Sequence, residues 1–313
     1  MVSVIHDNQV VGFFVGQKKW GGVNALYSPP MNTGTNNMGI VMFCPTTSEQ
    51  LITIYQEFAN WVFKKKIAQY IKIDDWNLHK DTDTYINESV YQDTRLLDIQ
   101  HQGRPTYYIN LKQSEDKLWH TMHYKSCRYC INKAIKNGLF VRRITDKNEI
   151  TQFVKIHRQQ ICDVSRRKGI ATRNYQEERK LLALCNLLFP NKVLLLQVIG
   201  NDDEKRAQVM ASGIWLIGKK EAVWWTGASF QRYQHYCPNE LMLWEALRII
   251  KKEGCESLNL CGMASYKHKY GSTITYVPRL FFRSHPYIIT MDEILKIIYR
   301  QIQFYKRKLK GKI

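Results

Sequence analysis

The sequence predicts an α+β protein made of two mixed α/β domains packed side by side. The chain has 313 residues, of which 44% are hydrophobic. At about 100 to 200 residues per domain, this is enough for two hydrophobic cores. Strand-like runs meet as hairpins beside amphipathic helices in both halves, and this order favours mixed sheets over a doubly wound parallel sheet. We expect one domain over residues 1–138 and the other over residues 139–313.

The first half is expected to mix short strands with helices. Thr46 and Thr47 precede Glu49 and Gln50 at capping-box spacing. Apolar residues then recur at helical intervals, so a helix is expected over residues 48–66. Strands are expected at residues 12–16, 40–43, 70–73, 89–91 and 105–111.

A second helix is expected to begin at Ser114 and to end at Gly138. Its apolar residues fall at spacings of three and four, so one face packs against the core. A neighbouring ridge carries Lys125, Arg128 and Lys136. These three side chains are expected to attract phosphate groups of a substrate.

The second half is also expected to mix strands with helices, in a similar order to the first. Strands are expected at residues 140–144, 192–199, 206–217, 222–229, 257–260 and 273–283. Helices are expected at residues 149–167 and 175–189, from Pro238 onward, and at residues 291–312. Residues 230–237 connect a strand to the helix that begins with Pro238.

A basic turn, Tyr266-Lys-His-Lys-Tyr-Gly271, follows the expected strand at 257–260. Side chains placed after a strand end project from the edge of a sheet, where ligands gather. Lys267 and Lys269 could bind phosphate or polarise a carbonyl, with Tyr266 and Tyr270 as hydrogen-bond donors. A solvated basic loop is the alternative. The acidic residues offer no obvious general base near this turn.

The charge balance points to a polyanionic partner. Forty-six Lys and Arg against 27 Asp and Glu leave a net charge of +19, which concentrates anions near the surface. Candidates are a nucleotide-linked sugar, coenzyme A, tRNA or an anionic membrane. The eight scattered cysteines and the lack of a long apolar run favour a cytoplasmic protein. Peripheral membrane contact through the basic helix at 291–312 is an alternative.

No metal site is expected. His120, His123, Cys127 and Cys130 have zinc-like spacing, but all four fall on one expected helix. Ten helical residues cover roughly 15 Å, whereas zinc needs its ligands within about 2.3 Å.

Several segments together resemble a known family. They are the helix and strand at 119–143, the strand end at 225–229, the Pro-started helix at 238–246, the strand end at 258–262, and the turn at 266–271. In order and spacing they resemble the FemABX-like peptidyltransferases, which form peptidoglycan bridges and are a branch of the GNAT acyltransferase superfamily.

The resemblance implies two GNAT-like domains, the second carrying most of the acyl-transfer site. It implies that an acyl group moves from aminoacyl-tRNA or acyl-CoA to an amine or hydroxyl of a cell-envelope glycan or peptidoglycan-type precursor. These carriers are co-substrates, so no permanently bound cofactor and no metal are implied. The competing interpretation is a catalytically inactive GNAT-fold protein that binds nucleic acid or an anionic membrane surface.

The resemblance also implies residue roles. Lys267 takes the position of the lysine that stabilises developing negative charge, with Tyr266 as the aromatic residue beside it. Arg232, Tyr233, Tyr270 and Lys269 are expected to position the substrate.

Three departures from the family pattern leave the donor and the base open. Asn259 stands where relatives often have an acid. No heptad pattern corresponds to the coiled-coil arm of some tRNA-dependent members. Residues 230–237 lack the glycine-rich loop that holds coenzyme A phosphates.

Overall fold

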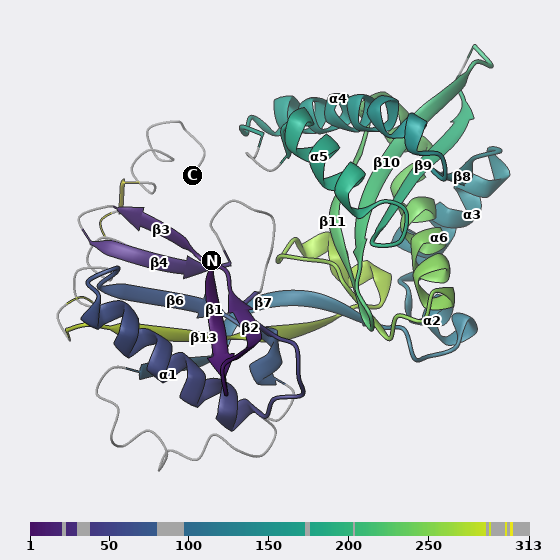
Figure 1. The fold of residues 1–313 in the computed structure, drawn as a ribbon. Coiled ribbons are helices and arrows are strands. Elements are labelled where there is room, and N and C mark those ends of the chain that lie inside the picture. The colour runs from purple at the N-terminus through teal and green to yellow at the C-terminus, as the bar shows by residue number, and fades with distance from the viewer. Residues whose placement is uncertain are drawn as a thin grey trace. The chain divides into compact units, whose positions relative to one another are not determined.

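The protein consists of two compact units. The computed structural model describes residues 1–20, 23–29, 38–79, 97–172, 176–202 and 204–285, with residues 288, 298, 301 and 302. One unit comprises Met1–Met31, Thr35–Arg104 and Tyr276–Ile313, and the other comprises Asn32–Gly34 and Pro105–Thr275. Each contains helices and a mixed sheet (Figure 1), which confirms the predicted fold class.

The first unit contains an antiparallel three-stranded sheet, four neighbouring strands of a mixed sheet and a covering helix. The small sheet has the order β1 (Val2–His6), β2 (Gln9–Phe14), β5 (Ile40–Met42). The four neighbouring strands have the order β3 (Gln17–Trp20), β4 (Asn24–Ser28), β6 (Tyr70–Asp74), β13 (Thr273–Arg283), and β4 and β6 are parallel. A 3₁₀ helix, η1 (Trp76–His79), follows β6.

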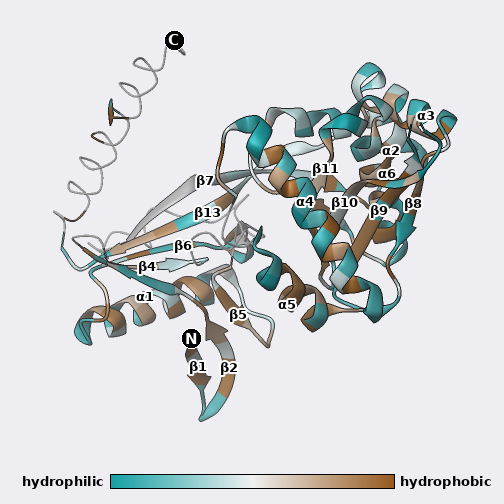
Figure 2. Ribbon diagram, turned by 90° about the horizontal axis from the view of Figure 1, so that it is seen from above, coloured by the Kyte–Doolittle hydropathy of each residue, from teal (hydrophilic) through white to brown (hydrophobic). Residues whose placement is uncertain are grey.

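Helix α1 (Ser48–Lys64) begins at the predicted capping box. The Thr47 side chain accepts from the Gln50 backbone, and the Gln50 side chain accepts from the Thr47 N–H. The apolar face of α1 buries Tyr55 and Val62 against the mixed sheet, and α1 has a hydrophobic and a hydrophilic side in Figure 2.

The second unit is built on the sheet that carries the candidate site. Its order is β7 (Leu97–Asn110), β12 (Ser257–Asn259), β11 (Glu221–Ser229), β10 (Ala207–Ile217), β9 (Val193–Asn201), β8 (Phe140–Arg143). The β11–β12 pair is parallel and the others are antiparallel. Its helical segments are α2 (Glu115–Thr121), π-helix η3 (Tyr124–Arg128), α3 (Tyr129–Lys136), η4 (Lys147–Glu149), α4 (Ile150–Lys168), α5 (Glu178–Leu188), η6 (Gln231–Tyr236), α6 (Pro238–Lys252) and η7 (Ser265–Tyr270).

Strand alternation gives this sheet two buried faces. Along β9, Leu194 and Leu196 lie in one apolar cluster with residues of α3 and α6. Val193 and Leu195 lie in a second cluster with residues of α4 and α5. Because neighbouring strand residues point to opposite faces, these helices cover the sheet from both sides (Figure 1).

The expected boundary at residue 138 does not coincide with the division into compact units. Helix α3, on the N-terminal side of that boundary, buries Ile131 and Ala134 in the core of the second unit. Strand β13 pairs its residues 279–283 with β6 of the first unit. The Arg279 side chain also holds Asp74 of β6 through contacts of 2.6 and 3.2 Å.

The single helix expected from Ser114 to Gly138 is wrong. Helix α2 ends at Thr121, Met122 has an extended ψ of 140°, and His123 starts a new helical segment. The His123 ring nitrogen accepts from the Ser126 N–H at 3.2 Å, which caps this second start. The His123 N–H is used elsewhere, because it donates to the Lys269 carbonyl at 2.8 Å.

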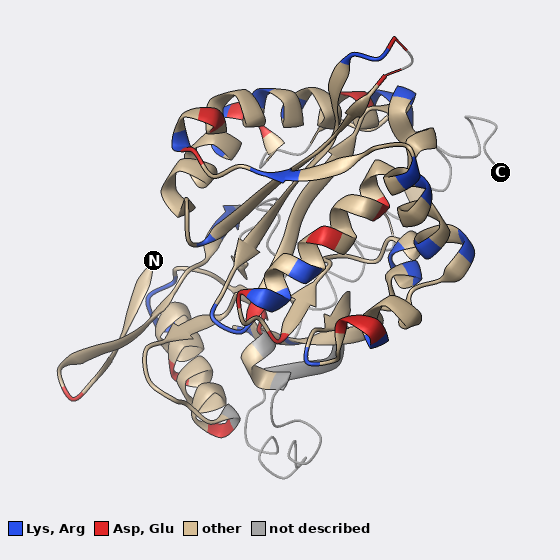
Figure 3. Ribbon diagram, turned by 90° about the vertical axis from the view of Figure 1, so that its right-hand side faces the viewer, with Lys and Arg blue, Asp and Glu red and all other residues tan. Residues whose placement is uncertain are grey.

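Charged residues lie mainly on helices and turns, and most of the strand ribbon is uncharged in Figure 3. Apart from residues 298, 301 and 302, the helix expected over 291–312 lies outside the described residues, as does the strand expected at 89–91. Among the described residues, no helix combines the length and apolar character needed to cross a membrane.

A fully buried polar chain lies between α4 and β10. The Ser212 hydroxyl donates to the Gln160 amide oxygen, which only accepts. A hydroxyl has one hydrogen, so the 2.8 Å contact of His157 Nδ1 with Ser212 Oγ is donated by the ring. His157 Nε2 then carries a lone pair and finds no partner among the described residues. Burial lowers the pKa of His157 to about 3, so the ring is neutral.

We predict that this histidine makes the second unit sensitive to acid. The unfolded chain binds the His157 proton below about pH 6.5, whereas the folded chain resists it down to about pH 3. Stability is therefore lost as the pH falls through this window, by about 2 kcal/mol between pH 7 and pH 5. Urea unfolding at both pH values should show this loss in the wild type and a smaller one in His157→Gln. The exposed His6 provides the control, because His6→Gln should keep the wild-type loss. Equal losses in wild type and His157→Gln would contradict the assignment.

Candidate functional site

The sheet of the second unit changes its pairing at the carboxyl ends of two parallel strands. Strand β12 pairs with β11 at only three positions, the last being Val223 with Asn259, although β11 continues to Ser229. In the pairing of β11 with β10, the register shifts between Trp224 and Thr226, so Trp225 is the extra residue of a β-bulge in β11. Such a bulge bends and twists its strand. The parallel ladder therefore ends where β11 still has six residues to run, Trp224–Ser229.

Asn259 organises the end of β12. It is fully buried, and its amide oxygen accepts from the Thr106 hydroxyl and the Cys261 N–H, both at 2.8 Å. Its amide nitrogen donates to the Tyr108 hydroxyl at 3.1 Å. The Tyr108 hydroxyl in turn donates its one hydrogen to the Glu221 carboxylate, and burial with this carboxylate raises the Tyr108 pKa well above its ordinary value. An amide serves here because this position must both accept and donate.

Lys267 ties the basic turn to the end of β12. Its side chain is buried, and its ammonium donates to the carbonyls of Leu260, at 2.6 Å, and Cys261. It also lies 5.8 Å from the ring centroid of Trp224. The predicted catalytic lysine thus lies beside the point where the ladder ends, with an ammonium held by backbone oxygens. Its role in stabilising charge stays a prediction.

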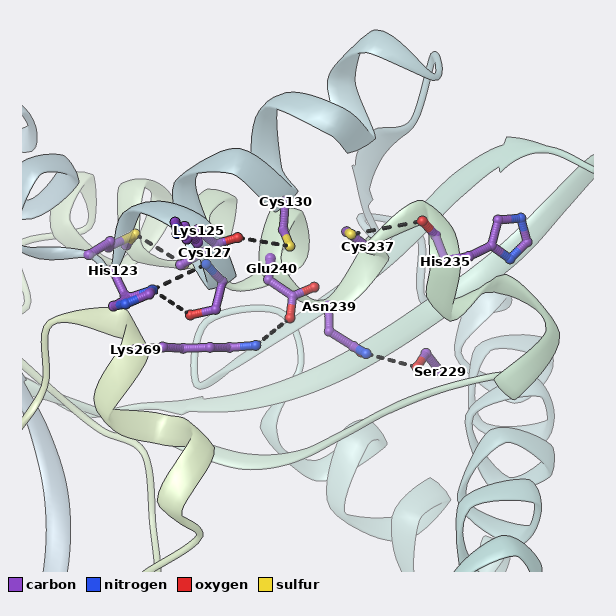
Figure 4. A network of polar contacts seen from close by, with 12 residues as sticks. His123, Lys125, Cys127, Cys130, Ser229, His235, Cys237, Asn239, Glu240 and Lys269 are labelled. Carbon is purple, nitrogen blue, oxygen red and sulfur yellow. Dashed lines mark hydrogen bonds and ion pairs between the residues drawn. The ribbon is translucent and has the colours of Figure 1, made fainter.

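Lys269 makes a short ion pair within the second unit, and its role in substrate binding stays a prediction. Its ammonium lies 2.5 Å from a Glu240 oxygen, and both side chains are largely buried, with exposures of 16% and 13%. Glu240 comes from the first turn of α6, where a carboxylate also complements the helix dipole. Figure 4 shows this pair next to His123, whose N–H binds the Lys269 backbone.

Two tyrosines of the turn point in different directions. Tyr270 is buried and packs edge-on against Trp224 at 6.5 Å between ring centroids, so it belongs to the core. Tyr266 is 47% exposed and can reach a ligand. The turn ends at Gly271, whose φ of +72° and position against Thr121 exclude a side chain.

Trp224 carries a buried donor with no partner. It is the first residue of β11 beyond the paired ladder, it is 8% exposed, and its indole N–H has no hydrogen-bond acceptor among the described residues. Buried donors are rarely left unsatisfied unless a ligand or water completes them. Trp224 is therefore a candidate ligand contact that the sequence interpretation missed.

The predicted residues Arg232 and Tyr233 lie on η6, which precedes α6. Tyr233 is buried, whereas Arg232 is exposed and stacks on the rings of Phe230 and Tyr233, at 5.2 and 4.7 Å. A shallow pocket is lined by Asp163, Phe230, Gln231 and Arg232. Asp163 of α4 accepts from the Gln231 N–H at 2.9 Å, which fixes the pocket wall.

The predicted basic ridge is only partly close to the turn. Lys125 and Arg128 lie on η3, directly after His123, and Arg128 packs on the Tyr124 ring at 5.2 Å. Lys136 lies in the last turn of α3, about 16 Å farther along the helical segment than Lys125. Lys125 and Lys136 are exposed. The structure thus brings two of these three cations near the turn.

The sequence interpretation also missed Glu240, the carboxylate nearest Lys269. The sequence feature that could have identified Glu240 is an acidic residue in the first turn of a helix that begins with proline. No group of three His, Cys, Asp or Glu side chains in the described part of the chain is arranged to hold a metal ion. Among the zinc-like residues, Cys127 is buried against the Met122 sulfur at 3.6 Å, whereas Cys130 points to the Lys125 carbonyl.

Comparison with known proteins assigns a domain type to the part of the chain that holds most of this site. Residues 122–270 match the family model described as "Acetyltransferase (GNAT) domain". The match spans just under half of the chain and identifies this part as a GNAT-type acyltransferase domain. No curated protein matches the sequence.

The fold of the chain resembles that of FemX, in agreement with the resemblance to the FemABX-like family found in the sequence. A crystal structure of FemX has a TM-score of 0.68 at 13% identity, covering 92% of this chain and 89% of FemX. The C-terminal domain of a putative lysylphosphatidylglycerol synthetase from Agrobacterium fabrum has a TM-score of 0.56 at 11% identity, with coverages of 88% and 81%. L-PGS from Bacillus licheniformis has a TM-score of 0.54 at 12% identity, with coverages of 92% and 86%.

We predict that Asn259→Asp destabilises the protein. A carboxylate at 259 cannot donate to Tyr108, whose single hydrogen would face two carboxylates, and the loss should be about 1–3 kcal/mol at pH 7. Urea unfolding measures it. Adding Tyr108→Phe should shrink the penalty of Asn259→Asp, because the contested hydroxyl is gone. Unchanged or higher stability of Asn259→Asp would contradict the donor assignment.

We also predict strong coupling between Lys269 and Glu240. Removing either charge leaves the other largely buried without its partner, so a double-mutant cycle of Lys269→Met and Glu240→Gln should give about 1–3 kcal/mol of coupling. The exposed pair Lys180–Glu177, with side-chain exposures of 48% and 54%, serves as the control and should couple far more weakly. Equal coupling in both pairs would show that Lys269 does not hold the turn.

Proposed function

We propose that the chain transfers an acyl or aminoacyl group from a carrier to an amine or hydroxyl of a cell-envelope precursor. The observation that carries this proposal is the end of the β11–β12 ladder beside buried hydrogen-bond donors. The backbone of β11 beyond Val223 is not paired with β12, and an extended acyl carrier can bind along such an edge. The GNAT domain match covers all of these residues.

The chemistry requires stabilisation of an oxygen that gains negative charge when the acceptor attacks the carbonyl. The ammonium nitrogen of Lys267 lies 5.8 Å from the centroid of the Trp224 ring, so these two donor side chains are neighbours. Both are held in place before substrate arrives, Lys267 by two carbonyls and Trp224 by the core. Preorganised donors need no rearrangement as charge develops. The exposed Tyr266 is assigned the role of orienting the substrate in this proposal.

The start of α6 favours a carrier other than coenzyme A. A helix N-terminus binds pyrophosphate through free N–H groups and its positive dipole end. Here Pro238 removes one N–H, and Glu240 already supplies a carboxylate to the first turn. The preceding residues form a 3₁₀ helix without glycine. We therefore propose aminoacyl-tRNA as the donor, in preference to acyl-CoA, the co-substrate of GNAT enzymes.

The acceptor proposal rests on charge and on structural likeness. Lys125 and Arg128 lie next to the turn and suit a phosphorylated or nucleotide-linked precursor. Two of the similar structures are of proteins named for lysylphosphatidylglycerol synthesis, so a lipid acceptor is included in the test.

We predict that purified protein moves label from aminoacyl-tRNA. It should be incubated with radiolabelled aminoacyl-tRNA or acetyl-coenzyme A, and with a peptidoglycan precursor or phosphatidylglycerol vesicles, followed by chromatography of the acceptor. Lys267→Met should lower transfer at least tenfold, about 1.4 kcal/mol in the barrier. Lys219→Met, in an exposed turn of the same unit, should match the wild type.

Three outcomes contradict parts of the proposal. Label from acetyl-coenzyme A alone would overturn the donor, and label only on phosphatidylglycerol would overturn the precursor. Full transfer by Lys267→Met would remove the role of Lys267. Circular dichroism of this variant separates loss of chemistry from loss of fold, because its two carbonyl contacts are also lost.

A further inference from the structure

Two cysteines from distant parts of the chain meet at the start of α6. Cys130 lies in the first turn of α3, and Cys237 is the N-cap residue of α6. Their thiols interact with each other, and Figure 4 shows both sulfur atoms beside Glu240. All eight cysteines are free, and these two are partly exposed, so reagents in solvent can reach them.

Both thiols contact backbone carbonyls at long distances. The Cys130 sulfur is 4.0 Å from the Lys125 carbonyl, and the Cys237 sulfur is 3.9 Å from the His235 carbonyl. These are long, weak contacts. Cys237 holds a left-handed conformation with φ of 60°, which is unusual for a residue with a side chain and directs the chain into α6.

We infer that Cys130 and Cys237 form a redox-active dithiol that a hydroperoxide or a small disulfide converts into a disulfide. The described residues provide no third ligand that would make this pair a metal site. Cys127, three residues before Cys130, is buried and faces the Met122 sulfur, so it competes poorly for the same partner.

The two sulfurs act in sequence. Burial and the neighbouring Cys130 thiol raise the pKa of Cys237 to about 12, which favours Cys130 as the first sulfur to react. With hydrogen peroxide, the Cys130 thiolate takes one oxygen to become a sulfenic acid and releases hydroxide. The Cys237 sulfur then displaces the sulfenic oxygen, which leaves as water, and the S–S bond forms.

The bond would join α3 to the start of α6, next to the Glu240–Lys269 pair that holds the basic turn. This consequence rests on the proposed function. If the turn carries the transfer site, oxidation should slow transfer and a dithiol reductant should restore it. The chemical link itself can be tested without any activity.

The experiment treats folded protein with limiting hydrogen peroxide or oxidised glutathione, then maps disulfide-linked peptides by mass spectrometry. The wild type should lose two of its eight thiols and give a Cys130–Cys237 peptide, and dithiothreitol should reverse both changes. Cys130→Ser and Cys237→Ser should give no such peptide. Cys162→Ser, a matched control at a partly exposed cysteine of α4, should behave as the wild type.

Several results would overturn the inference. These are a Cys127–Cys130 link, a stable glutathione adduct at Cys130 without the second bond, or no thiol loss at all. In the transfer assay, oxidised wild type should lose at least half of its rate and Cys237→Ser should not. A complete link with an unchanged rate would overturn the effect on transfer while leaving the dithiol in place.

Discussion

The arrangement of the second unit depends on Lys269, which joins three segments of the chain. Its carbonyl accepts the His123 N–H at 2.8 Å, and its ammonium pairs with Glu240 at 2.5 Å. The start of η3, the start of α6 and the basic turn are thereby held together. Because both side chains are largely removed from water, separating the two charges would leave the desolvation of each uncompensated.

Because some of the cations are structural, the net charge of the chain is a poor guide to which residues bind a ligand. Lys267 and Lys269 are counted in the charge of +19, yet both are used to hold the turn. Arg279 likewise binds Asp74 in the first unit. A lysine in this turn thus acts first as a structural cation, and any catalytic role of Lys267 is added to that. Exposed cations, Lys125 of η3 and Lys136 of α3 among them, remain available for long-range attraction of an anionic substrate.

Local patterns in the sequence were enough for most helices and strands, because their causes are local. The Thr47–Gln50 capping box, the left-handed Gly169 that ends α4, and Pro238 at the start of α6 act within a few residues. The break after Thr121 has a distant cause, since the His123 N–H is taken by Lys269. The return of β13 to β6 also depends on pairing between segments far apart in sequence. Neither is encoded in a short window.

The candidate site shows the same division between local and distant causes. The basic turn was visible because its residues are consecutive, and its position after β12 followed from the strand pattern. In the sequence, Asn259 stood out only because relatives often have an acid at this position. Its structural role depends on Tyr108 and Glu221, and no sequence spacing connects these two residues to Asn259. Trp224 was hidden for a related reason. An aromatic residue in a strand normally fills a core, and only the folded structure shows that the indole N–H of Trp224 finds no acceptor among the described residues. A buried donor kept unpaired lowers stability, so its retention beside Lys267 favours a ligand that completes it.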